Sequence, residues 1–268
     1  MFSAVEIVAI LLIGATAGLV TGLIGASGVM VIVPALTISL NYAVHTAIGT
    51  SLLITVIASS VTSFIYYSHG NIYVRPALWV AVASIAGAQA GSAFADIIPP
   101  VGMGSLFGFF LIPMGVVFWV RGARRTAGLE EEQAHSSGGS VQVMTLKSRI
   151  YALGLGLFVG IMCGLFGAGG GIMFLLILVF VLRYPLHLAV GTSSLIMAIT
   201  ASSGAIGYGI RGNIDAYAAL IASVTIVLVA SQGARLANRV SQIVLGRIIG
   251  TILVALGITM IVLNILGE

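Results

Sequence analysis

The sequence contains few charged residues. Only 18 of its 268 residues are Asp, Glu, Lys or Arg, which is 7% of the chain, whereas 59% are hydrophobic and the mean hydropathy is +1.19. A soluble domain has about 25% charged residues, so this chain lacks the polar surface that a soluble domain needs. Disorder is excluded as well, because disordered chains combine low hydrophobicity with high net charge. We therefore expect an integral membrane protein.

Several kinds of site are also missing from the sequence. Cys163 is the only cysteine, which excludes an internal disulfide and a thiolate metal cluster. The Walker A, HExxH and GxSxG patterns are absent, so we expect neither an enzyme nor a bound cofactor or metal. No charged residue lies at the centre of an apolar run, which argues against a carboxylate proton relay or a buried cation site. The net charge of +4 indicates orientation in a membrane rather than nucleic-acid binding.

The apolar residues form two sets of five continuous runs. Because these runs do not alternate polar and apolar residues, they predict helices and not a β-barrel. The second run of each set is only about twelve residues, so it is either a short tilted helix or a re-entrant one. The fold class is an all-α polytopic membrane protein, with runs at about 5–24, 29–40, 46–68, 76–95 and 101–120, then 150–166, 171–182, 188–210, 216–234 and 243–264.

A charged segment separates the two sets. Residues 121–149 hold eight of the 18 charges and a Ser/Gly tract, which is typical of a flexible linker, with a regulatory loop as the alternative. We divide the chain into a first transmembrane repeat (1–121), a cytoplasmic linker (122–148) and a second transmembrane repeat (149–268). The N-terminal run has no basic residue before it and carries Glu6, so we interpret it as a retained helix and not as a cleaved signal peptide.

The distribution of lysine and arginine predicts the orientation. If each run crosses the membrane once, ten of the eleven basic residues lie on one side and only Arg211 lies on the other. The positive-inside rule then places both termini outside and the central loop in the cytoplasm. A multi-pass protein of the inner membrane is expected.

The two sets are copies of each other. With an offset of 142 residues, positions 14–74 align with 156–216 without a gap, and 23 of 61 pairs are identical. The motif at 22–28 matches the one at 164–170, and His45-x-Ala-x-Gly-Thr-Ser matches the same pattern from His187. Five crossings per copy is an odd number, so equivalent positions face opposite sides of the membrane. Such inverted repeats are characteristic of transporters with a site near the midplane.

Glycine-rich breaks between the first and second runs are the leading candidates for that site. A helix that starts after such a break directs free N–H groups toward it, which suits an anion; the alternative is that the glycines only permit tight helix packing. The predicted substrate-binding residues in the two breaks are Gly25, Ala26, Ser27 and Gly28, and Gly167, Ala168, Gly169, Gly170 and Gly171.

Polar side chains near these breaks complete the candidate site. Thr50, Ser51, Thr192 and Ser193 offer hydroxyl donors, or else bond to their own helices. Gln89 and Gln232 either face the substrate path or bond between helices, and they are one position out of register. His45 and His187 are a repeat pair that could couple proton movement to transport, although a histidine satisfied by the protein is the simpler interpretation.

The paired Gly-Leu-x-Gly-Ala-x-Gly breaks, each followed by Ala-x-Gly-Thr-Ser, resemble the sulfite exporter TauE/SafE family. The resemblance covers both halves and implies a secondary transporter of sulfite or an organosulfonate such as sulfoacetate, working as an exporter. The first break reads GASGV where the second reads GAGGG, so the halves are expected to contribute unequally. The alternatives are a transporter or importer of a carboxylate and a membrane scaffold that acts through the central loop. The expected partners are the bilayer and a small anion, without nucleic acid; a homodimer is left open.

Overall fold

The computed structural model describes residues 3–25, 28–95, 116, 146–166, 170–182 and 184–266, and every element in these ranges is a helix. Five helices are long and apolar enough to cross a membrane: 5–24, 44–68, 77–94, 186–210 and 216–239. The elements are α1 (Ala4–Ile24), α2 (Val29–Leu40), α3 (Val44–Ser68), α4 (Val74–Ala95), α7 (Leu146–Phe166), α8 (Gly170–Leu176), the π-helix η2 (Ile177–Val181), α9 (Leu186–Ile210), α10 (Ala216–Arg239) and α11 (Gln242–Leu266).

Local sequence signals determine where several helices begin and end. Ser3 and Glu6 form a reciprocal capping box at the start of α1, and Gly25 ends this helix in the left-handed conformation. The Asp215 side chain accepts hydrogen bonds from the backbone N–H groups of Tyr217 and Ala218 and so caps α10. The expected run 101–120, apart from Val116, and residues 122–145 of the expected linker lie outside the described residues. The last three residues of the expected linker, 146–148, instead form the start of α7.

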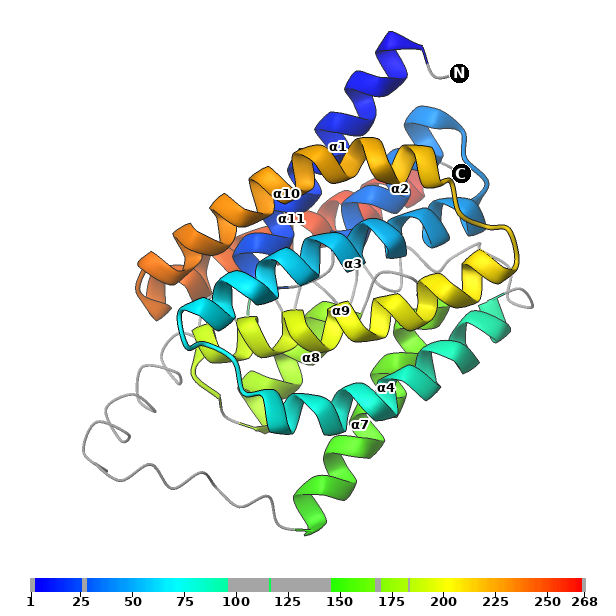
Figure 1. Ribbon diagram of the computed structural model, residues 1–268. Coiled ribbons are helices and arrows are strands. Elements are labelled where there is room, and N and C mark those ends of the chain that lie inside the picture. The colour runs from blue at the N-terminus through cyan, green and yellow to red at the C-terminus, as the bar shows by residue number, and fades with distance from the viewer. Residues whose placement is uncertain are drawn as a thin grey trace.

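The third helices of the two halves, α3 and α9, lie side by side (Figure 1). A Cβ atom on Gly49 would lie 3.0 Å from the Tyr208 Cβ, and one on Gly191 would lie 2.8 Å from the Tyr66 Cβ. The start of each helix therefore meets the end of the other, so α3 and α9 are antiparallel. These two contacts are also related by the offset of 142 residues.

The first helix of each half packs against the fourth helix of the other half. In α1, Gly14, Gly18 and Gly22 face α10, where a Cβ on Gly18 would lie 3.2 Å from the Ala230 backbone nitrogen. The equivalent glycines of α7, at 156, 160 and 164, face α4 in the same way, with a Cβ on Gly160 only 2.7 Å from the Ser84 Cα. Glycine at every fourth position lets the two backbones approach closely, as is common between membrane helices.

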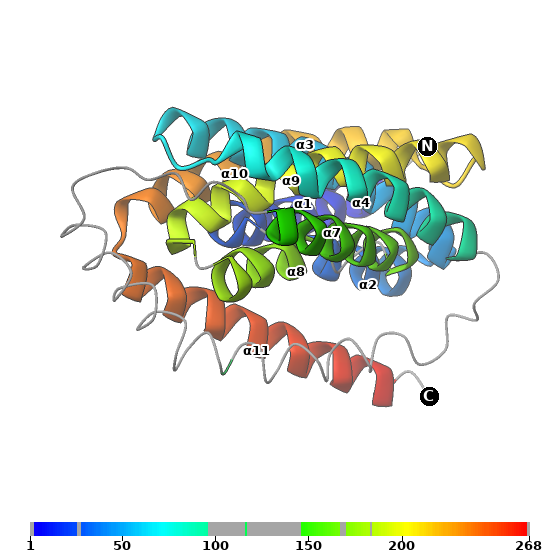
Figure 2. The same cartoon turned by 90° about the horizontal axis from the view of Figure 1, so that it is seen from below.

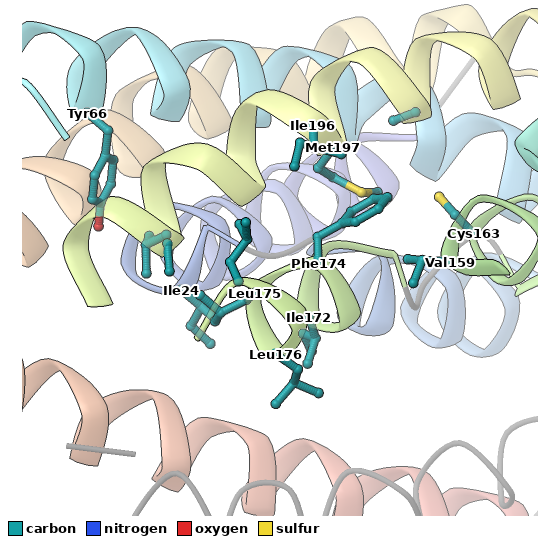
Figure 3. Close-up of a cluster of buried hydrophobic side chains, with 14 of the residues drawn as sticks. Ile24, Tyr66, Val159, Cys163, Ile172, Phe174, Leu175, Leu176, Ile196 and Met197 are labelled. Carbon is teal, nitrogen blue, oxygen red and sulfur yellow. The ribbon is translucent and has the colours of Figure 1, made fainter. Parts of the chain in front are cut away.

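The second helices, α2 and α8, lie in a lower layer of the bundle in the view of Figure 2. Figure 2 shows α3, α4, α9 and α10 in one layer, with α1 and α7 beneath them and α2, α8 and α11 beyond. Buried side chains from α1, α3, α7, α8 and α9 form one apolar cluster, which includes Phe174 and Met197 (Figure 3). The helix α8 therefore reaches the middle of α9.

The contact between α4 and α9 differs in polarity from the equivalent contact between α10 and α3. Between α4 and α9, the hydroxyls of Ser84 and Thr200 lie 2.5 Å apart and are fully buried. The repeat equivalents of these residues, on α10 and α3, are Ile226 and Ala58, which are also buried. At these equivalent positions, one flank thus carries a contact between two hydroxyls and the other carries apolar side chains.

Candidate functional site

The first break separates α1 from α2 and needs glycine at its start. Gly25 has φ 65°, and its backbone N–H donates to the Thr21 carbonyl at 2.8 Å. A side chain is strained in this left-handed conformation. The helix α2 then begins at Val29 with Gly28 as its N-cap and has no side-chain cap. Ala26 and Ser27 lie outside the described residues.

This break lies against the start of α9, which belongs to the other half. A Cβ on Gly25 would lie 2.6 Å from the Val190 side chain and 2.7 Å from the Ser194 hydroxyl. The Ser193 hydroxyl donates to the Gly25 carbonyl at 3.3 Å and to the Val190 carbonyl at 3.0 Å. The structure thus brings two predicted site residues, Gly25 and Ser193, together across the halves.

The second break leads into α8. Gly167, Ala168 and Gly169 lie outside the described residues, whereas Gly170 and Gly171 are buried at the start of this helix. A Cβ on Gly170 would lie 2.9 Å from the Cys163 Cβ and 3.4 Å from the Met197 sulfur. Met197 is near the middle of α9, so Gly170 lies near the middle of the bundle.

Gly28 is packed as tightly as Gly170. A Cβ at this position would lie 2.7 Å from the Ala17 Cβ and 2.8 Å from the Ala17 carbonyl oxygen. Bulky replacements at either glycine therefore disturb helix packing as well as any bound anion. The break glycines are therefore needed for close helix packing, and this need is compatible with their predicted role in binding an anion.

The two threonines tie each half to a loop of the other. The Thr50 hydroxyl accepts a hydrogen bond from the Asp215 backbone N–H at 2.9 Å, and the Thr192 hydroxyl accepts one from the Tyr73 N–H at 3.1 Å. Thr50 and Thr192 are fully buried. The offset of 142 relates the two bonds to each other.

These threonines do not lie together. Thr50 is at the level of Tyr208 on α9, which is sixteen residues from Thr192. At a rise of 1.5 Å per residue, the two positions are separated by about 24 Å along the helix. Ser51 donates to the carbonyl of Ile48 on its own helix at 2.7 Å. In this conformation, these hydroxyls hold the protein together.

The two glutamines have different surroundings. The Gln89 side-chain amide donates to the Ser203 carbonyl at 2.7 Å and lies 3.0 Å from the Ser203 hydroxyl, which links α4 to α9. Gln232 is exposed on α10. Gln89 therefore forms a hydrogen bond between α4 and α9, which was one of its two predicted roles.

The two histidines also differ. The His187 Nε2 lies 2.9 Å from the Ala237 carbonyl oxygen and 3.1 Å from that of Val240, so it donates to the end of α10. The His45 Nδ1 is buried and has no hydrogen-bond partner among the described residues. A role of either histidine in proton coupling stays a prediction.

The loop beside Thr50 contains a contact that the sequence analysis did not identify. The Tyr42 hydroxyl donates to the Asp215 carboxylate at 2.7 Å, and burial together with this carboxylate raises the pKa of Tyr42 far above its usual value. The repeat equivalents, Tyr184 and Tyr73, have ring centroids 5.5 Å apart. Burial, with a smaller effect of Tyr73, raises the pKa of Tyr184 to about 12. The sequence contained one sign of this contact, because tyrosine occupies both equivalent positions of the repeat, 42 and 184.

These features define a multi-pass helical membrane protein. The first helix of each half packs against the other half, and a glycine-rich segment follows each first helix. The chain belongs to the family described as Sulfite exporter TauE/SafE, whose profile matches residues 10–260. Its similarity extends to the "Probable membrane transporter protein YdhB" of Bacillus subtilis, with 29% identity over 85% of this chain and 89% of the relative. Proteins named "Probable membrane transporter protein" from Xylella fastidiosa (27% identity, 92% of each chain) and Methanocaldococcus jannaschii (25%, 94% of each) are also similar. No solved structure matches.

Proposed function

We propose that this protein is a secondary transporter that exports a small sulfur oxyanion, such as sulfite or an organosulfonate, across the inner membrane. Its ten segments form two inverted repeats of five, with both termini outside and the linker in the cytoplasm. The membrane transporter function is that of the family, whereas the substrate and the direction of transport are our proposal.

The packing between the halves is the observation that carries this proposal. Equivalent helices α3 and α9 are antiparallel, and α1 and α7 exchange their partners α10 and α4. An inverted pair of this kind has two related conformations, one open to each side of the membrane. Alternating access then requires a substrate site that both conformations share.

The breaks at Gly25–Gly28 and Gly167–Gly171 supply that site. Each break lies between a first helix and a second helix, and the first N–H groups of a helix have no partner within that helix. Sulfonates keep their negative charge at neutral pH, so hydrogen-bond donors hold them without a formal countercharge. Glycine at the breaks leaves the backbone N–H groups without a side chain that would shield them from an anion.

Anion exchange in proteoliposomes tests the proposed function. Vesicles containing the purified protein are loaded with sulfoacetate, sulfite, sulfate, taurine or acetate, and uptake of labelled sulfoacetate and sulfite is measured at matched ionic strength. We expect exchange with sulfite or sulfoacetate and little with acetate. Equal exchange with acetate would indicate that the substrate is a carboxylate and not a sulfur oxyanion. No exchange with any of the anions would refute the proposed function.

A deletion separates this function from a scaffold role. Removing residues 126–146 shortens the linker and leaves both sets of apolar runs intact. A transporter keeps most of its flux after this deletion. A scaffold that acts through the central loop instead loses its function while the membrane part remains folded.

A further inference from the structure

The helix α3 carries three buried hydroxyls without partners. The hydroxyl groups of Ser59, Thr62 and Tyr66 have no hydrogen-bond partner in the part of the chain that the structure describes. All three residues are fully buried. A buried polar group without a partner is costly, and native proteins contain few of them. Three on one helix therefore call for an explanation.

The other buried hydroxyls of the bundle show that this arrangement is not general. Ser51, Ser194 and Thr200 each donate to a carbonyl three or four residues earlier in their own helix. Ser59 and Thr62 lie inside a regular helix, where the same bond is available, yet they do not make it. Their hydroxyls are therefore free to donate elsewhere.

The second half has no copy of this hydroxyl line. Tyr208 is the repeat equivalent of Tyr66, and its hydroxyl donates to the Gly164 carbonyl at 3.3 Å. The positions equivalent to Ser59 and Thr62 are Ala201 and Gly204. The line of free hydroxyls therefore belongs to the first half alone and is not a by-product of the repeated fold.

The hydroxyl line connects the levels of the two breaks. Tyr66 contacts Gly191, whose neighbour Val190 lies against Gly25 of the first break. In the Figure 3 view, the Tyr66 ring extends away from α3 toward the level of Ile24, the last residue of α1 before this break. One end of the line thus lies beside the first break.

The other end lies at the level of the second break. Because Leu52 of α3 meets Gly204 and Tyr66 meets Gly191, Ser59 faces the part of α9 near Met197. A Cβ on Gly170 would lie 3.4 Å from the Met197 sulfur, with Cys163 closer still. Ser59 and Tyr66 are seven residues apart, which is almost two turns, so both face α9 and are separated by about 10 Å along the axis.

We propose that Ser59, Thr62 and Tyr66 bind the transported oxyanion as it passes between the two glycine breaks. Each hydroxyl donates one hydrogen bond to an anion oxygen, and neighbouring hydroxyls are close enough along the helix for the anion to contact them in turn. Neutral donors suit a substrate that has to leave again, because they avoid a fixed countercharge. This inference rests on the proposed function.

The test uses Tyr66→Phe and its repeat control Tyr208→Phe, each of which removes one hydroxyl. Ser59→Ala and Thr62→Val are compared with Ser202→Ala and Thr251→Val, whose hydroxyls bond only to their own helices. Binding is measured as stabilisation by sulfite and sulfoacetate, and transport as exchange of the same anions. We expect the three α3 variants to weaken binding and raise the KM about 10- to 100-fold, the range for a hydrogen bond to a charged group. The controls should stay within about twofold of the wild type.

Stability without ligand provides the second readout. Tyr66→Phe should leave the melting temperature unchanged or raise it, because its hydroxyl has no partner, whereas Tyr208→Phe should lower it. A melting temperature lowered equally by both changes would overturn the proposal, since Tyr66 would then bond to the protein. Normal anion affinity and exchange in all three α3 variants would also overturn it and would assign the hydroxyls to bound water. Failure of the wild type to exchange any anion would refute the proposed function together with this inference.

Discussion

Replacing Thr50 with valine removes one hydrogen bond between the halves and changes the shape of the side chain little. The Thr50 hydroxyl is fully buried and accepts the Asp215 backbone N–H at 2.9 Å. Leaving a buried donor without a partner costs about 1–3 kcal/mol. Asp215 also caps α10 and accepts the Tyr42 hydroxyl, so its displacement weakens a cap worth about 1 kcal/mol. We expect Thr50→Val to destabilise the protein by about 2–3 kcal/mol.

The repeat equivalent should have a smaller effect. Thr192→Val frees the N–H of Tyr73, which is 39% exposed and therefore closer to the surface than Asp215. Tyr73 has no carboxylate that caps a helix, so we expect a loss of about 1 kcal/mol. The control is Thr251→Val, which lies on an exposed face of α11 and should change stability by less than about 0.5 kcal/mol.

Thermal unfolding in detergent, followed by intrinsic fluorescence, ranks the three variants. The expected order of destabilisation is Thr50→Val, then Thr192→Val, then Thr251→Val. If Thr50→Val were no less stable than the control, the bond to Asp215 would not hold the halves together. If Thr192→Val were the most destabilised, the argument from the exposure of the freed N–H would be wrong.

Two further predictions concern packing and pH. Gly160→Ala should destabilise the protein by about 1–3 kcal/mol, because the added Cβ would overlap the Ser84 carbonyl. The control Gly154→Ala, on the same helix, places its Cβ in open space and should be neutral or stabilising. Thermal unfolding of both variants measures the difference, and equal effects would contradict the close packing of α7 on α4. The pKa of Tyr184 is raised to about 12 from the ordinary tyrosine value of 10.0, which contributes stability below pH 10 that is lost as the pH rises toward 12. Tyr184→Phe should therefore lose less stability than the wild type between pH 9 and 11, and parallel pH profiles would exclude this role.

Hydropathy predicted the described helices well. The expected run at 29–40 is α2, and that at 171–182 corresponds to α8 with η2. The start of α7 was missed by four residues, because its first turn contains Lys147 and Arg149 and a search for apolar runs ends at such charges. Apolar composition therefore identifies the buried part of a helix and not its polar end.

The positions of the site residues were harder to predict. Thr50 and Thr192 were chosen for their hydroxyls, yet each bonds to a loop more than a hundred residues away, and a single sequence contains no sign of such a contact. The glutamines illustrate a geometric reason. Gln232 is one residue beyond the equivalent of Gln89, and one residue turns a helix by about 100°. Gln89 consequently meets α9, whereas Gln232 is exposed.

The exchange of first helices between the halves affects how the chain can be made in the cell. The glycine face of α1 is synthesised first, but its partner α10 follows only about 200 residues later. At a translation rate of about 5–20 residues per second, α1 waits for about 10–40 s beside lipid or the insertion machinery. Among the described helices, each first helix packs mainly against the fourth helix of the other half. The packing of α1 on α10 can therefore form only after the second half has entered the membrane. A prematurely terminated chain leaves the glycine face of α1 uncovered and exposed to the cell's quality-control proteases.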